Sequence, residues 1–116
     1  MNRDMSFREA VALAESIISR CEKIEGRAWG AEGAVIELSK QVGELSRLVM
    51  AMEGYYFPQR GKLDKQYQAS REKIGDELAD VLYAVIRIAR HYQIDLLAAH
   101  LKARKGEDAS LRRMGG

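Results

Sequence analysis

Hydrophobic side chains recur every three or four residues through most of this chain, the spacing that places them on one face of an α-helix. No segment alternates apolar and polar residues as a half-buried β-strand would. The pattern predicts helices over about 6–25, 35–52, 70–92 and 96–105. We therefore expect an all-α protein.

Residues with strong preferences for helix ends mark the boundaries of the first two helices. Ser6 and Glu9 have the spacing of a capping box, which predicts a helix start at Ser6. Gly26 and Gly54 follow the two apolar stripes, where a left-handed residue commonly ends a helix.

The last helix is expected to be short. Asp95 is placed to cap its N-terminus, and Gly106 is expected to stop it. The polar residues 107–116 then form a frayed tail behind a single domain that spans 1–106.

The third helix has an apolar surface wider than one stripe. Leu82, Tyr83 and Ile86 extend it roughly halfway round the helix, at about 100° per residue. A few short helices cannot bury so much apolar surface by themselves. We therefore predict a homodimer or a homotetramer, in which a second copy completes the core.

The composition excludes several classes of protein. With 47% hydrophobic and 31% charged residues, the bulk of the chain is not disordered. The formal net charge of +2 gives no argument for a nucleic-acid polymer as partner. No apolar run is long enough for a membrane span, and the N-terminus has no signal-peptide core. A single cysteine excludes an internal disulfide, so we expect a cytoplasmic protein.

Acidic side chains flank the apolar stripes of the second and third helices. Glu37, Gln41 and Glu44 follow one another at helical spacing, as do Glu77 and Asp80. If the two helices pack antiparallel, these groups converge, and like charges held close require a cation. Mg²⁺ prefers such oxygen ligands, and Mn²⁺ could replace it. Solvated charges on two amphipathic helices are the alternative interpretation of the same spacing.

The two acidic segments resemble the paired motifs of MazG-like all-α nucleoside triphosphate pyrophosphohydrolases. The first is Gln41-Val42-Gly43-Glu44-Leu45, the second is Asp76-Glu77-Leu78-Ala79-Asp80-Val81-Leu82, and Ile94-Asp95-Leu96 is similar to the usual continuation. The resemblance covers roughly residues 35–105. It implies a bundle of four or five helices, completed by homo-oligomerisation, that holds Mg²⁺ between the motifs.

The resemblance also implies an activity. A nucleoside triphosphate, canonical or damaged, would be hydrolysed to monophosphate and pyrophosphate. Glu44, Glu77 and Asp80 match metal ligands of the family, and a carboxylate such as Glu44 or Glu77 would serve in catalysis.

One position departs from the family pattern. Gln41 stands where the first motif usually begins with an acid, and an amide brings neither negative charge nor a base. Glu37, one helical turn earlier, is the residue that could compensate. An active hydrolase, a degenerate relative that binds nucleotide, and a helical module that binds a protein partner all stay open.

Aromatic and basic residues outside the motifs are candidates for substrate binding. Aromatic rings can stack on a base, and cationic side chains can bind phosphates. The candidates are Trp29, Tyr55, Lys62, Lys73 and Arg87, with Lys65 in the same loop as Tyr55 and Lys62. Trp29 is equally suited to anchor the packing, the loop aromatics to cover the bundle, and the basic residues to pair with acids on the surface.

Overall fold

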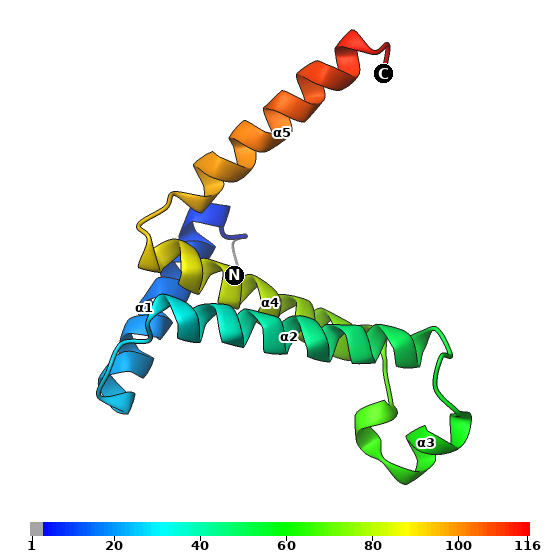
Figure 1. The fold of residues 1–116 in the computed structure, drawn as a ribbon. Helices are drawn as coiled ribbons and strands as arrows, with labels where there is room; N and C mark the ends of the chain where they lie inside the picture. Colours follow the sequence, from blue (N-terminus) through cyan, green and yellow to red (C-terminus); the bar gives the residue numbers. More distant parts are fainter. Residues whose placement is uncertain (1–3) are drawn as a thin grey trace. The chain divides into compact units, whose positions relative to one another are not determined.

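The computed structural model describes residues 4–116, and all its regular elements are helical (Figure 1). They are α1 (Phe7–Glu25), α2 (Ala31–Met52), α3 (Pro58–Leu63), the 3₁₀ helix η1 (Lys65–Tyr67), α4 (Arg71–His91) and α5 (Leu96–Arg113). No strand occurs within the described residues. The predicted all-α class is confirmed.

The predicted start of α1 is confirmed. The Ser6 hydroxyl accepts a hydrogen bond from the Glu9 backbone N–H, and the Glu9 carboxylate accepts one from the Ser6 N–H. At the other end, Gly26 has a φ of 79°, the left-handed conformation that glycine adopts without strain. The local sequence therefore determines both ends of this helix.

The predicted helices α2 and α4 are both present, but α2 begins earlier than its apolar stripe predicts. α2 begins four residues before the first residue of its predicted stripe, Val35, and ends at Met52. Gly54 follows with a φ of 78°, and the Tyr55 N–H closes the turn by donating to the Met50 carbonyl.

The segment between α2 and α4 contains two short helices, α3 and η1. Pro58 opens α3 at its first turn, where a missing N–H is tolerated. The Tyr56 and Tyr67 rings meet edge to face with centroids 4.9 Å apart, and the Arg60 guanidinium lies against both rings. Aromatic and cation–π contacts thus hold α3 and η1 together.

The prediction that Gly106 stops the last helix is wrong. α5 continues through Gly106 to Arg113, so most of the predicted tail over 107–116 is helical. One ion pair at helical spacing, Arg104 with Glu107, spans this glycine, and a second, Asp108 with Arg112, follows it. Such pairs support a helix interior that contains one glycine.

The described residues form two compact units. The first comprises 4–28 and 89–116, and the second comprises 29–88. In the first unit the Arg90 guanidinium donates to the Glu22 carboxylate at 2.6 Å and to the Ser19 hydroxyl at 2.9 Å. The second unit contains α2, α3, η1 and most of α4, and therefore both acidic segments.

Part of the apolar surface of the second unit is uncovered. Ile86 is buried, but Leu82 is 45% exposed, and Ile36 and Leu78 are exposed to a still greater degree. In the predicted oligomer a second copy of the chain would cover this surface. The oligomer stays a prediction. Within residues 4–116, no helix has the length and apolar character that a membrane span requires.

Candidate functional site

The two acidic segments lie on neighbouring helices of the second unit. α2 and α4 run side by side in opposite directions (Figure 1), so Glu44 of α2 comes near Glu77 and Asp80 of α4. A spacing of three residues places Glu77 and Asp80 on the same face of α4. The charges of Asp80 and Glu44 both act on Glu77, and the convergence of the three carboxylates on one cation stays a prediction.

Glu77 is the most unusual of these acids because its side chain is buried, with an exposed fraction of 8%. Its Oε2 atom is buried without a hydrogen-bond partner. Burial raises the pKa of the Glu77 carboxyl, and the charges of Asp80 and Glu44 raise it further. An unpartnered carboxylate oxygen beside two other acids is what a hard divalent cation requires of its ligands.

Glu44 already has a cationic partner. The Arg47 Nη2 atom donates to the Glu44 Oε2 atom at 2.5 Å, one turn further along α2. This hydrogen bond and the charge of Arg47 lower the pKa of the Glu44 carboxyl. Within residues 4–116, no three acidic, histidine or cysteine side chains are placed closely enough to hold a metal ion between them.

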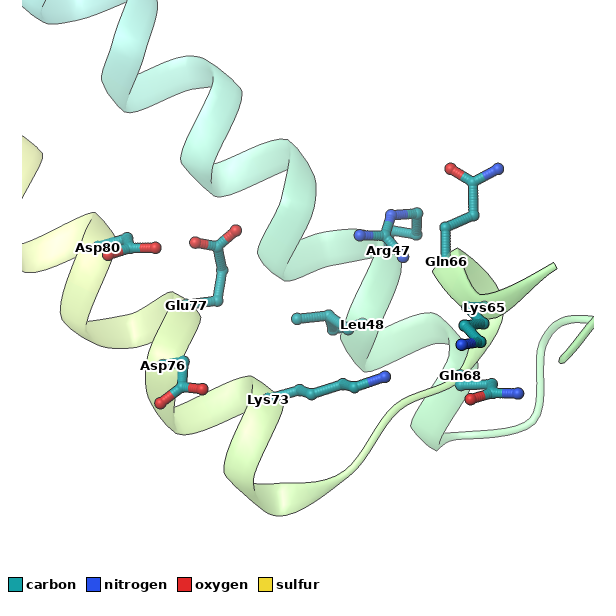
Figure 2. A pocket seen from close by; sticks show the side chains of 9 residues that line it. All are labelled: Arg47, Leu48, Lys65, Gln66, Gln68, Lys73, Asp76, Glu77 and Asp80. Carbon is teal, nitrogen blue, oxygen red and sulfur yellow. The ribbon is translucent and has the colours of Figure 1, made fainter.

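An open pocket of about 390 Å³ lies beside the acids (Figure 2). Figure 2 shows Asp76, Glu77 and Asp80 on α4, and Lys73 extending from the start of α4 toward η1. The remaining lining residues are Arg47, Leu48, Lys65, Gln66 and Gln68. One part of the pocket therefore carries carboxylates and the other carries cations and amides.

Gln41 and Glu37 are hydrogen-bonded to one another. The Gln41 Nε2 atom donates to the Glu37 Oε1 atom at 2.7 Å, and neither residue lines the pocket. Glu44 does not line the pocket either, so only Glu77 and Asp80 among the predicted metal ligands are lining residues.

The candidate substrate-binding residues lie in three places. Lys73 lines the pocket, as does Lys65. Tyr55 is 75% exposed and Lys62 is exposed on α3, and neither lines the pocket. Trp29 and Arg87 contact one another instead, with the Arg87 guanidinium carbon 4.3 Å from the Trp29 ring centroid.

Five lining residues were not predicted from the sequence: Arg47, Leu48, Gln66, Gln68 and Asp76. For Arg47 a signal was available, since an arginine three residues after a glutamate is placed to pair with it in a helix. Gln66 and Gln68 line the pocket because of the path that the chain takes through α3 and η1. Elements this short contain too few residues for hydrophobic periodicity to predict them.

Comparisons with protein-family models, curated proteins and solved structures find no match to this chain.

Proposed function

We propose that this protein is a Mg²⁺-dependent nucleoside triphosphate pyrophosphohydrolase of the MazG-like type, acting on the cytoplasmic nucleotide pool. The observation that carries the proposal is the Glu77 carboxyl, which is buried beside Asp80 and Glu44 with one oxygen unpartnered. Burying a carboxylate among like charges is unfavourable unless a cation compensates it. The resemblance of both acidic segments to the family motifs supports the same conclusion.

Glu44, Glu77 and Asp80 are the residues that would hold Mg²⁺, or Mn²⁺ in its place. All three supply carboxylate oxygens, the ligands that these hard cations prefer. A bound cation supplies neutralisation of phosphate charge and a water of lowered pKa. Gln41 and Glu37 would join only if the hydrogen bond between them opened.

The chain itself would bind and orient the nucleotide. Lys65 and Lys73 line the pocket beside the acids and provide ammonium groups for the phosphates. A carboxylate beside the cation, Glu44 or Glu77, would accept a proton from the attacking water. Attack at the α-phosphorus would break its bond to the bridging oxygen, releasing the monophosphate and pyrophosphate.

A second candidate function is a non-catalytic helical oligomer that binds nucleotide or a protein partner. The observation that favours it is Gln41, which replaces an acid of the motif and is hydrogen-bonded to Glu37. The exposed Ile36, Leu78 and Leu82 would lie in the contacts of a homodimer or homotetramer.

The experiment that separates the two is pyrophosphate release from a panel of ribo- and deoxynucleoside triphosphates with Mg²⁺ or Mn²⁺. Glu77→Ala removes the central carboxylate, and Glu72→Ala is the matched control, because Glu72 is exposed on the same helix. We expect release by the wild type and by Glu72→Ala, and none by Glu77→Ala.

Release by all three proteins would indicate a contaminating enzyme. No release by any of them, with nucleotide binding retained in calorimetry, would favour the non-catalytic candidate. The substrate hydrolysed fastest would identify the preferred base and sugar.

A further inference from the structure

Arg47 lies where the acidic and basic parts of the pocket meet (Figure 2). It comes from α2, and its side chain is 25% exposed. The carboxylates of α4 lie on one side of it and Lys65 on the other. An arginine in this position can reach either a metal-binding carboxylate or a bound phosphate.

The guanidinium group of Arg47 is only partly satisfied. Nη2 donates to Glu44, but the Nη1 atom is buried without a hydrogen-bond partner. A buried donor of this kind requires an acceptor, and the residue that carries it lines the pocket. Guanidinium groups bind phosphate through two parallel hydrogen bonds, so an entering phosphate would satisfy both nitrogens at once.

Glu44 cannot serve two cations equally well. While Arg47 holds Glu44 at 2.5 Å, it neutralises a carboxylate that the proposed function assigns to the divalent cation. A divalent cation at Glu44 would repel the Arg47 charge and compete for the same oxygen. The long arginine side chain can turn into the pocket, where Lys65 and Lys73 already favour an anion.

We propose that Arg47 is a counterion that changes partners: it pairs with Glu44 in the free protein and moves to a nucleotide phosphate when Glu44 binds the divalent cation. The inference rests on the proposed function, because it requires both ligands. It makes cation and nucleotide binding cooperative, since the cation alone leaves Arg47 without an acceptor and the nucleotide provides one.

The test compares two binding measurements on the full chain. The first is Mn²⁺ alone, followed by electron paramagnetic resonance. The second is the preformed complex of Mn²⁺ with a nucleoside triphosphate whose α–β bridging oxygen is replaced by a methylene group, followed by calorimetry. For Arg47→Gln we expect Mn²⁺ alone to bind about three- to tenfold more tightly and the complex to bind about tenfold more weakly. A purely structural role of Arg47 would weaken both.

Two further variants serve as controls for the loss of charge and for the shape of the side chain. Arg104→Gln removes the same charge from a Glu–Arg pair on α5 that does not line the pocket, and is expected to change neither binding constant. Arg47→Lys retains the charge, so it should bind Mn²⁺ alone as the wild type does and the complex more weakly. If Arg47→Gln does not give a native circular dichroism spectrum, Arg47→Lys takes its place, and its weaker binding of the complex still tests the contact of Arg47 with phosphate.

The outcomes distinguish this inference from the proposed function. If Glu77→Ala leaves Mn²⁺ binding unchanged, the carboxylates form no cation site and both proposals fail. If Glu77→Ala abolishes Mn²⁺ binding but Arg47→Gln does not tighten it, only the exchange of partners by Arg47 is overturned. Opposite shifts for Mn²⁺ and for the complex support the inference.

Discussion

The guanidinium carbon of Arg87 lies 4.3 Å from the centroid of the Trp29 ring, so a cation from α4 stacks on the residue just ahead of the N-cap of α2. Tyr83, one turn earlier on α4, lies 5.5 Å from the same guanidinium carbon. Arg87 is only 9% exposed, and its Nε atom has no hydrogen-bond partner. Both aromatic rings contact this mostly buried cation, so cation–π contacts contribute to its stabilisation.

Removing both partners of this stack should destabilise the fold less than the sum of the single changes. We expect Trp29→Leu and Arg87→Met each to lower the free energy of unfolding by about 1–3 kcal/mol, with a coupling of about 0.5–1 kcal/mol between them. Urea unfolding of the four proteins measures the cycle. Strictly additive effects would contradict a stabilising cation–π contact.

Glu77→Gln should stabilise the metal-free protein while abolishing hydrolysis. Because the pKa of Glu77 is raised in the folded chain, the protonated form favours folding. The stability gained from the protonated carboxyl is complete below the pKa that Glu77 has in the unfolded chain. It disappears as the pH rises through the pKa that Glu77 has in the folded chain. The gain from Glu77→Gln is therefore negligible in acid and grows as the pH rises toward 7.

Urea unfolding in the presence of a chelator, at acidic and neutral pH, checks this expectation. Glu72→Gln is the control, because it removes an exposed charge from the same helix. A loss of stability at pH 7 in Glu77→Gln would show that the ionised carboxylate has a partner that compensates its burial.

Gln41→Glu should make the stability of the protein depend on Mg²⁺. The new carboxylate would replace the 2.7 Å hydrogen bond to Glu37 with repulsion at helical spacing, lowering the free energy of unfolding by about 0.5 kcal/mol without metal. If Mg²⁺ binds here, the fourth carboxylate strengthens its binding and the ion restores the stability. Thermal unfolding with and without Mg²⁺ measures both effects, and an equal response of wild type and variant to Mg²⁺ would be the contrary result.

Gly106→Ala should stabilise α5. Gly106 is inside the helix, and a Cβ atom added there meets nothing within 4 Å. Alanine in a helix interior is favoured over glycine by about 0.5–1 kcal/mol. Amide hydrogen exchange over 107–113 should slow in the variant. Unchanged exchange would mean that the helix ends at Gly106, as the sequence alone predicts.

Features that depend on neighbouring residues could be predicted from the sequence. The capping box of Ser6 and Glu9 and the turn at Gly26 involve groups within a few residues of one another. The stripes of α2 and α4 are likewise local, because side chains three and four residues apart share a face of any helix. The same rule explains why Glu77 and Asp80 could be selected as a pair.

The continuation of α5 shows where local rules are ambiguous. Glycine at 106 is equally compatible with a helix end and with a helix interior, and an ion pair across it and another after it accompany the second outcome. The residue type alone does not distinguish the two cases, because the difference is of the order of 1 kcal/mol.

The all-α class, the approximate extent of the helices up to α4, the spacing of the acids and the local pairing of Arg47 with Glu44 follow from the sequence alone. Tertiary contacts are what bury Glu77 with an oxygen unpartnered and bring Lys65 of η1 to the pocket. Helical periodicity is a property of adjacent turns. Burial, electrostatic neighbours and pocket lining depend on distances between residues far apart in the chain, which periodicity does not specify.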